Sequence, residues 1–287
     1  MGTVPAPRPR VVACMPTWNA AAFVEPVLRS LDAQTYPDLQ VLISDDASSD
    51  ATAALCERFA RDRPRFTVHR QARNRGWIGN VNWLLKHAEG EYLFFAFHDD
   101  PLEPSYVERL VAALEAAPDA VLAFSDITID LRGGAQNLVT QWSFPDLDAV
   151  ATARERLRVL TPMQGHWWIP NRGLFRRSAA RSVGGMRRHL AGELSADWPW
   201  LVHLSLLGSF VRVPEPLVRK VRRQEGLSMS WNRPPGWRLG VVLGAAREVA
   251  AADLPRRLRL RLLADFWSHW LGTWWRTRAS WIARLRR

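Results

Sequence analysis

The chain has 287 residues, of which 47% are hydrophobic, which is enough for one large folded domain with an appendage. The net charge is +11, but nine Arg and one Asp lie between residues 256 and 287, so the rest of the chain is nearly neutral. This uneven charge argues against a nucleic-acid-binding protein, whose positive charge would spread over a binding face. Two cysteines, Cys14 and Cys56, are too few for a disulfide framework.

The chain also has no apolar run of about 18 residues, the length that a membrane-spanning helix needs. Its first ten residues contain no apolar signal region. We therefore expect a cytoplasmic protein, located at the inner face of the membrane if its basic C-terminal end contacts lipid.

Short apolar runs alternate with amphipathic segments in the first half of the chain. Strands are predicted at residues 11–15, 40–44, 66–69, 91–97 and 121–124. Helices are predicted between them, at about 20–31, 51–60, 81–89 and 104–116, and Asn19 is expected to cap the first. This alternation predicts right-handed crossovers and a mainly parallel sheet flanked by helices.

The pattern is looser in the second half. Residues 127–170 predict loops with one helix near 147–159, followed by a strand at 173–175 and a helix at 178–183. Asp197 opens a predicted helix at 197–207, and two short strands are expected at 210–213 and 216–222. Helices resume near Trp237 and again from about 254 to the end.

Polar and aromatic side chains follow three of the buried strands. They are Thr17, Trp18 and Asn19 after the first, Asp45 and Asp46 after the second, and Asp99 and Asp100 after the strand at 91–97. In open α/β sheets, ligands bind outside the carboxyl ends of the strands. An indole can stack on a base, a carboxylate can accept a base N–H, and adjacent carboxylates can hold a divalent cation with substrate phosphates. The competing interpretation is that Asp99 and Asp100 cap the turn before Pro101.

No glycine-rich dinucleotide fingerprint or P-loop is present, so another way of holding a nucleotide is needed. The chain resembles the family 2 glycosyltransferases, which have the GT-A fold. The resemblance covers roughly residues 10–230 and is carried by PTWN at 16–19, SDDASSDAT at 44–52, NRGWIGNVN at 74–82, AEGEYLFFAFHDD at 88–100, GLFRRSAARSVGG at 173–185 and ADWPWLVHLSLLG at 196–208.

The resemblance implies a role for each matching residue. The nucleotide is expected to contact Pro16, Thr17, Trp18, Asn19, Asp45, Asp46, Arg73, Asn74, Gly76 and Asp99. Asp100, with Asp99 beside it, matches the motif that binds Mn²⁺ or Mg²⁺. Within that pair, Asp100 is the expected metal ligand and Asp99 the expected ribose or sugar contact. His98 departs from the family pattern and is expected to be structural, with support of the metal site or contact with the acceptor as the alternatives.

Asp197 matches the catalytic base of the inverting members, and the competing interpretation is a helix N-cap. The family often has an acidic pair at this point, whereas this chain has Ala196 followed by Asp197. Gln224 stands where related sequences often place a His, which leaves a further protein contact to the metal open.

The function implied is an inverting, metal-dependent transfer of a sugar from a nucleotide-diphosphate sugar, most commonly a UDP-sugar, to a hydroxyl acceptor. The alternatives are a nucleotidyltransferase of related fold and a non-catalytic glycan-binding or scaffold protein. His166, Trp167 and Trp168 could form an acceptor platform or pack in the core. Arg176 and Arg177 could meet a diphosphate or form a solvated face.

Two domains are expected. Residues 1–230 would form the GT-A domain, with a donor half at about 10–126 and an acceptor half at about 127–230. Residues 231–287 would form a basic, Trp-rich helical extension, with five Trp and nine Arg after residue 255. This extension is expected either to pack on the domain or a second subunit, or to lie on an anionic membrane.

Overall fold

The computed structural model describes residues 8–130, 139–163, 165–221, 233 and 235–285, the last ten of them by backbone alone. The strands are β1 (Val11–Thr17), β2 (Leu39–Asp45), β3 (Phe66–Arg70), β4 (Tyr92–Phe95), β5 (Ala120–Asp130), β6 (Val139–Trp142), β7 (Leu174–Arg176) and β8 (Ser209–Val221). The helices are α1 (Val24–Asp32), α2 (Thr52–Ala60), α3 (Gly76–His87), α4 (Tyr106–Ala116), α5 (Ala153–Leu160), α6 (Arg177–Val183), α7 (Asp197–Leu207), α9 (Trp237–Ala251) and α10 (Arg256–Leu285). Two short 3₁₀ turns are η1 (Pro145–Leu147) and η2 (Pro170–Arg172).

One mixed sheet runs through the molecule in the order β3-β2-β1-β4-β7-β5-β6, with β8 paired to β5. The first four of these strands are parallel, so their carboxyl ends meet at one edge. The short strand β7 lies antiparallel between β4 and β5. Its start therefore lies at the same edge as the end of β4.

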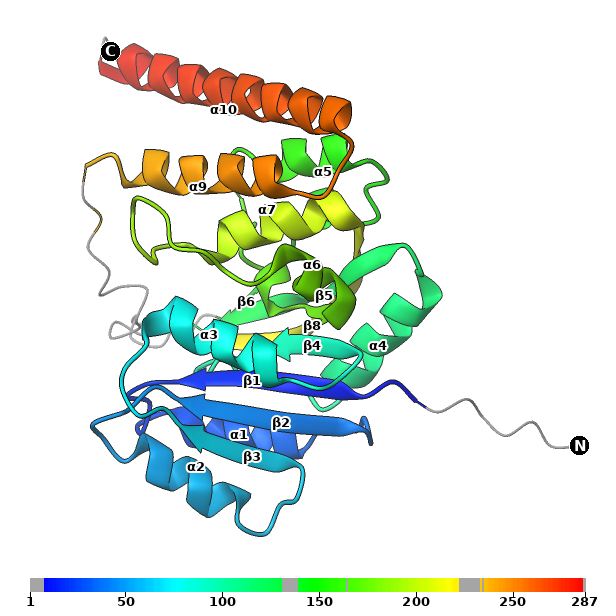
Figure 1. Ribbon diagram of the computed structural model, residues 1–287, viewed down its shortest axis with the longest axis vertical. Coiled ribbons are helices and arrows are strands. Elements are labelled where there is room, and N and C mark those ends of the chain that lie inside the picture. The colour runs from blue at the N-terminus through cyan, green and yellow to red at the C-terminus, as the bar shows by residue number, and fades with distance from the viewer. Residues whose placement is uncertain (1–7, 131–138, 164, 222–232, 234, 286–287) are drawn as a thin grey trace, which may run out of the picture.

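The core forms because the strands bury apolar side chains on both faces and the helices cover them. β1 and β4 are buried along their whole length, as their continuous apolar sequences predict. Helices α1 and α4 bury residues at helical spacing against the sheet. The mixed α/β architecture, with helices around a central sheet, is the fold class expected from the sequence (Figure 1).

The structure differs from the sequence-based expectation in the second half. β5 extends to Asp130, and β6 occupies part of a segment for which loops were expected. The two strands expected at 210–213 and 216–222 are one strand, β8, whose register against β5 shifts between Val213 and Pro216. The strand was predicted as two because it contains Pro214 and Pro216, and proline within a strand usually marks its end or a bulge. Asn19 does not cap α1, which begins at Val24.

The C-terminal helices pack on the rest of the protein in successive layers (Figure 1). α9 lies on α7, where buried Glu248 binds His203 at 2.8 Å and also pairs with Arg187. α10 crosses over α9 and α5, and Arg154 of α5 pairs with Asp265 at 2.7 Å. The packing expected of the extension is therefore present along its first part.

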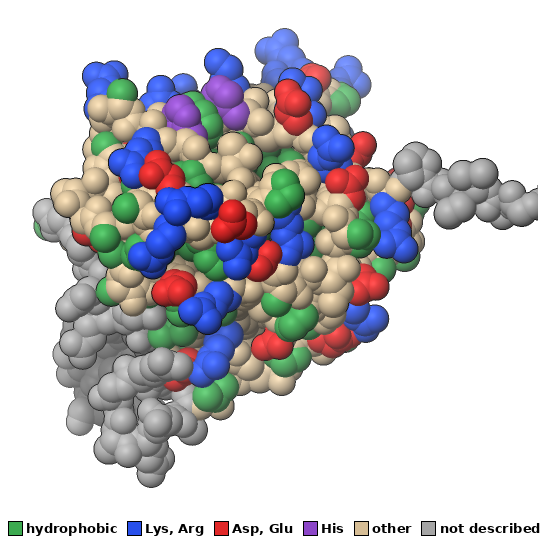
Figure 2. Space-filling view, turned by 90° about the horizontal axis from the view of Figure 1, so that it is seen from below, with side chains coloured by type: hydrophobic (Ala, Val, Ile, Leu, Met, Phe, Trp, Pro, Cys, Tyr) green, Lys and Arg blue, Asp and Glu red, His purple; other side chains and the backbone are tan. Residues whose placement is uncertain are grey.

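No helix in the described part of the chain is both long and apolar enough to cross a membrane. On the face shown in Figure 2, Lys and Arg side chains are interspersed with Asp and Glu, and no single sign dominates.

Candidate active site

A cavity of about 280 Å³ lies at the carboxyl ends of β1 and β2, beside the start of α3. Its lining residues are Pro16, Thr17, Trp18, Asp46, Asn74, Gly76, Trp77, Asn80, His98 and Glu193. Six of these ten were expected at the nucleotide site from the sequence. Trp18 is 42% exposed, so one face of its indole is accessible to a planar ligand.

The adjacent carboxylates Asp45 and Asp46 have different surroundings. Asp45 turns into its own loop, where it accepts hydrogen bonds from the Ser48 backbone N–H at 3.0 Å and the Ser48 hydroxyl at 2.6 Å. Asp46 lines the cavity and accepts a hydrogen bond from the Arg75 backbone N–H at 2.8 Å. Burial raises the pKa of Asp46, and the backbone donors of Arg75 and Gly76 oppose that shift. Asp46 is therefore the carboxylate placed to meet a ligand.

The loop before α3 closes one side of the cavity. Asn74 donates to the Asp46 carbonyl at 3.2 Å and accepts from the Gly76 backbone N–H at 3.0 Å, which fixes the entry to the helix. Gly76 has a φ of 76°, and a Cβ there would lie 2.7 Å from Glu193. Arg73 is exposed and is not among the residues that line the cavity.

Asn19 lies beside the cavity and joins the loop after β1 to the loop after β2. Its backbone N–H donates to the Ser48 hydroxyl at 2.9 Å, and its side-chain oxygen accepts from the Ser49 backbone N–H at 2.9 Å. Asn19 has a φ of 46°, a left-handed conformation that Asn tolerates better than most residues. Its contacts within the described residues are thus with the neighbouring loop.

The end of β4 turns sharply at His98, Asp99 and Asp100. His98 contacts the Pro16 carbonyl through Nδ1 at 2.9 Å and also lines the cavity. Asp100 is buried and binds Arg172 at 2.6 Å, with Lys220 at 3.5 Å. Burial would raise the pKa of Asp100, but the two cations outweigh it and hold the pKa below its usual value. Asp99 is half-buried, and no described side chain forms an ion pair with it.

Lys220 reaches Asp100 because the chain after β4 runs beside β8. Arg219 donates its backbone N–H to the Pro101 carbonyl at 2.9 Å, and Leu102 forms a bridge with Val218. These contacts bring Lys220 within 3.5 Å of Asp100, although the two residues are 120 positions apart in the sequence.

Asp197 is the first residue of α7, and it accepts a hydrogen bond from the Asn171 side chain at 2.8 Å. Enclosure by protein raises the pKa of Asp197 to about 6, although nearby Arg172 and the first backbone N–H groups of the helix favour the charged form. A carboxylate with this pKa is protonated and deprotonated near neutral pH, as a general base requires. The N-cap residue of α7 is Ala196, and Asp197 is the first residue inside the helix.

Half-buried aromatic rings lie close to Arg172. The rings of Trp142 and His166 are 4.3 Å apart, and Trp142 and Trp168 are 6.0 Å apart. Arg172 lies over Trp168 at 5.0 Å. Trp167 instead packs edge-on against buried Trp198 of α7.

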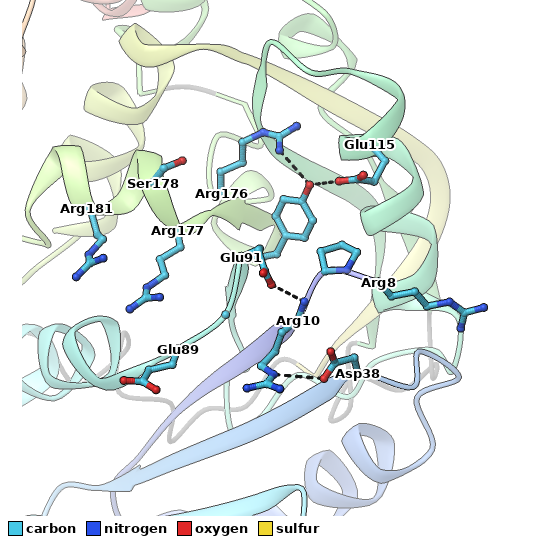
Figure 3. Close-up of a pocket in the computed structure, with 13 residues that line it drawn as sticks. Arg8, Arg10, Asp38, Glu89, Glu91, Glu115, Arg176, Arg177, Ser178 and Arg181 are labelled. Carbon is cyan, nitrogen blue, oxygen red and sulfur yellow. Dashed lines mark hydrogen bonds and ion pairs between the residues drawn. The ribbon is translucent and has the colours of Figure 1, made fainter. Parts of the chain in front are cut away.

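Arg176 and Arg177 lie at the opposite edge of the sheet, away from the cavity that holds Trp18 and Asp46, so the structure does not support the alternative that they meet a diphosphate there. They line a wider pocket with Arg10, Glu91 and Tyr92, at the amino ends of β1 and β4 (Figure 3). Arg176 donates to the Tyr92 hydroxyl at 3.0 Å and to backbone carbonyls. The antiparallel direction of β7 carries these residues away from the carboxyl ends of β1 and β4.

Four residues of this region were missed from the sequence: Asn171, Arg172, Glu193 and Lys220. None of them follows a predicted parallel strand, and none was expected from the family resemblance. Asn171 and Arg172 could have been found from their position directly before the predicted strand at 173–175. If that strand is antiparallel to the others, it starts at the edge where the parallel strands end. Gln224, expected near the metal, lies outside the described residues.

Comparison with known proteins identifies the class. The family model described as glycosyl transferase family 2 matches residues 12–178, more than half of the chain, and the protein therefore belongs to that family.

Several curated relatives carry names that agree with this family. The chain is 33% identical over 95 residues to the GalNAc(5)-diNAcBac-PP-undecaprenol beta-1,3-glucosyltransferase of Campylobacter jejuni, covering 33% of this chain and 31% of that protein. It is 28% identical over 127 residues to the poly(ribitol-phosphate) beta-N-acetylglucosaminyltransferase TarS of Staphylococcus aureus, covering 43% of this chain and 22% of TarS. The chain thus spans a third or less of these relatives' length.

Solved structures share the fold over most of the chain. Residues 1–349 of S. aureus TarS, in complex with UDP-GlcNAc, match with a TM-score of 0.69 at 20% identity, covering 91% of this chain and 72% of that one. The mannosyltransferase PcManGT of Pyrobaculum calidifontis, in complex with GDP-Man and Mn²⁺, matches with a TM-score of 0.57 at 19% identity, covering 94% and 72%. The GT-A fold expected from the sequence is confirmed.

Proposed function

We propose that this glycosyltransferase moves a sugar from a nucleotide-diphosphate sugar to a hydroxyl acceptor with inversion at the anomeric carbon, and that Asp197 is the base. The observation that carries this proposal is the position of Asp197. Asp197 has a pKa of about 6 and accepts a hydrogen bond from Asn171 in the turn η2. The next residue of this turn, Arg172, binds Asp100, two residues after His98 of the donor cavity.

In the proposed reaction the acceptor O–H gives its proton to the Asp197 carboxylate. The acceptor oxygen forms a bond to the anomeric carbon as the bond from that carbon to the diphosphate breaks. The electron pair of the broken bond leaves with the nucleoside diphosphate. Asp197 then returns the proton to solvent, so one carboxylate is enough.

The donor cavity supports a nucleotide as the leaving group. Trp18 offers a partly exposed indole, and Asp46 offers a carboxylate to a base N–H. We infer a UDP-sugar, because the solved TarS structures that share the fold bind UDP-GlcNAc and UDP.

We also propose a divalent metal, Mn²⁺ or Mg²⁺, held by Asp99. No group of three or more His, Cys, Asp or Glu side chains in the described chain is arranged to hold a metal ion. Such a cluster is not required, because Mg²⁺ in phosphate sites usually takes one or two carboxylates, substrate phosphates and water. Asp99 fits that description, whereas Asp100 already binds Arg172 and Lys220. When bound, the metal would stabilise charge on the leaving diphosphate.

The end of α10 supports a peripheral contact with an anionic membrane, and a lipid-linked acceptor would then be within reach. Leu271, Trp274 and Trp275 are exposed, the last by 64%. Basic residues with interfacial Trp and Leu suit a helix that lies on such a surface. The alternative to membrane binding is that this surface joins two copies of the chain. Vesicle binding and the oligomeric state of the protein distinguish the two.

The test of the proposed function is a panel of nucleotide-sugars, incubated with and without Mn²⁺, with released nucleoside diphosphate as the readout. We expect one donor, a UDP-sugar, to be turned over by the wild type and not by Asp197→Asn. Release of pyrophosphate or of a sugar 1-phosphate would instead indicate a nucleotidyltransferase. Binding of donor without turnover under any condition would indicate a non-catalytic protein.

A further inference from the structure

The turn η2 contacts both carboxylates of the catalytic centre through two consecutive side chains. Asn171 donates to Asp197 Oδ2 at 2.8 Å, and Arg172 donates to Asp100 Oδ2 at 2.6 Å. One carboxylate begins α7 and the other ends the turn after β4, so the two belong to separate elements. The short turn is therefore the direct link between them.

Asn171 orients the Asp197 carboxylate. Its amide nitrogen engages Oδ2, and this leaves Oδ1 of Asp197 available to accept a proton from a substrate hydroxyl. The amide oxygen of Asn171 is buried, and no described residue offers it a hydrogen bond. A buried acceptor without a partner costs about 1–3 kcal/mol. An amide placed at that cost is better explained by what it does for Asp197 than by stability.

Arg172 is fixed on several sides. Its guanidinium lies 4.9 Å from the Phe97 ring and 5.0 Å from the Trp168 ring, and it donates to the Trp168 carbonyl at 3.1 Å. The Arg172 side chain is 11% exposed. An arginine held in this way gives Asp100 a partner with a defined position.

The backbone of the turn is equally constrained. The Tyr106 hydroxyl, fully buried in α4, donates to the Arg172 carbonyl. Gly173 has no room for a side chain, because a Cβ there would lie 2.4 Å from the Ala123 carbonyl oxygen. The turn is therefore anchored to α4 and β5, and it cannot shift without disturbing both.

We propose that Asn171 and Arg172 are the positioning residues of the catalytic centre: Asn171 sets the orientation of the base Asp197, and Arg172 holds Asp100 so that the end of β4 keeps the shape that binds the donor. This proposal rests on the proposed function, because it takes Asp197 as the base. Neither residue touches the reacting atoms. The two contributions are separable, since Asn171 acts on proton transfer and Arg172 acts mainly on donor binding.

The variant Asn171→Leu tests the role of Asn171. The assay is hydrolysis of the UDP-sugar that the wild type accepts, with water as the acceptor. Leu has a similar volume, and it removes both the donor to Asp197 Oδ2 and the unpaired amide oxygen of Asn171. We expect kcat to fall at least tenfold, because a hydrogen bond to a charged group is lost. The UDP dissociation constant should stay unchanged. The acid limb of the pH–rate profile should move to higher pH by about one unit, because a donor that favours the charged carboxylate is gone. Arg172 keeps its charge in this variant, so the shift reports Asn171.

Gln34→Leu is the matched control, because Gln34 is a buried amide that joins α1 to the start of α4, away from the site. It should lower the melting temperature and leave the pH profile in place. If Asn171→Leu lowers the melting temperature but keeps the wild-type pH profile, the role of Asn171 is merely structural. The proposal that Asn171 orients Asp197 would then be overturned.

Arg172→Met tests the second part. We expect UDP to bind about tenfold more weakly, because the Asp100 charge loses its main partner and the turn at the end of β4 is released. Arg172→Lys should recover part of that affinity, since it restores the charge without the planar contact. Arg212→Met is the control, because it breaks a comparable buried pair with Asp126 at another place. Equal UDP affinity in Arg172→Met and wild type would overturn the assignment to Arg172.

The outcome for Asp197→Asn separates the two proposals. If this variant retains full hydrolysis, the proposed base is wrong and the role of Asn171 falls with it. If it is inactive while Asn171→Leu keeps the wild-type rate and pH profile, the proposed function stands and only the positioning role is overturned. UDP binding to Arg172→Met is measured without catalysis and so does not depend on either result.

Discussion

Asp99 and Asp100 are neighbours in the chain, yet among the described residues only Asp100 is paired with cations, Arg172 and Lys220. Asp99 is half-buried. The resemblance alone suggested Asp100 as the metal ligand, and that assignment stays untested. The geometry leads us to propose the reverse division of roles.

Substitution of the two residues should separate these roles. Asp99→Ala should abolish the stimulation of hydrolysis by Mn²⁺ and leave the melting temperature unchanged. Asp100→Asn should destabilise the protein by about 3–5 kcal/mol, because it leaves two cations without their buried partner. Thermal melts and a Mn²⁺ titration measure both effects. If Asp100→Asn is stable and is the variant that loses the Mn²⁺ response, Asp100 is the metal ligand after all.

The pKa of Asp197 predicts the acid side of the pH–rate profile. The base must be deprotonated to accept a proton, so kcat should fall as the pH drops through about 6. The profile of kcat between pH 4.5 and 8.5 checks this for UDP-sugar hydrolysis. A wild-type rate that is flat down to pH 5 would contradict the assignment.

The same pKa predicts that the base lowers the stability of the fold. The folded pKa of about 6 lies above the usual aspartate pKa of 3.8, so the folded state binds the proton more tightly. Stability should therefore fall as the pH rises from 3.8 towards 6, and the cost should be complete above that. Asp197→Asn removes the charge, and at pH 7.5 it should raise the free energy of unfolding by about 1–3 kcal/mol. Chemical denaturation at pH 7.5 measures this, and a less stable Asp197→Asn would contradict it.

Trp18 should contribute to nucleotide binding through stacking. Trp18→Ala is expected to weaken UDP binding about tenfold, the usual loss of one base–aromatic contact. Calorimetry with UDP measures the change. Trp83→Ala is the matched control, because Trp83 stacks between His69 and His87 on the far side of α3. An equal loss in both variants would assign the effect to folding rather than to stacking.

The exposed side of α10 should bind anionic lipid. Leu271→Ser/Trp275→Ser is expected to lower binding to phosphatidylglycerol-containing vesicles at least tenfold, because two apolar anchors are removed. Leu190→Ser is the control, since Leu190 is 83% exposed in a different loop. Co-sedimentation measures the binding. A wild type that ignores vesicles but forms a dimer that the double variant loses would identify the surface as a subunit contact.

Much of the fold was predictable because its signals are local. β1, β2 and β4 are apolar runs, and α1 and α4 repeat apolar residues at helical spacing. α7 was predicted at residues 197–207 and lies there in the structure. These patterns do not depend on which strands become neighbours.

The strand-end rule found only those candidate site residues that follow a parallel strand, whereas Asp197 was expected from the family resemblance. Thr17, Asp46 and Asp99 share that position, so one rule found them. Arg172 and Lys220 meet Asp100 only because β7 and β8 take particular places in the sheet. Partner choice of that kind depends on contacts between distant segments, and no local pattern in the sequence records it.

The antiparallel entry of β7 has a consequence for how this enzyme can change. The cavity for the nucleotide is built from the loops after β1 and β2 and the start of α3, whereas the hydrogen bond to the base comes from a turn about 100 residues later in the chain. Under the proposed mechanism, substitutions at residue 171 would adjust the pH at which transfer is fastest without altering the choice of nucleotide. Working pH and donor specificity would then be encoded on separate segments, and selection could act on one while the other stays fixed.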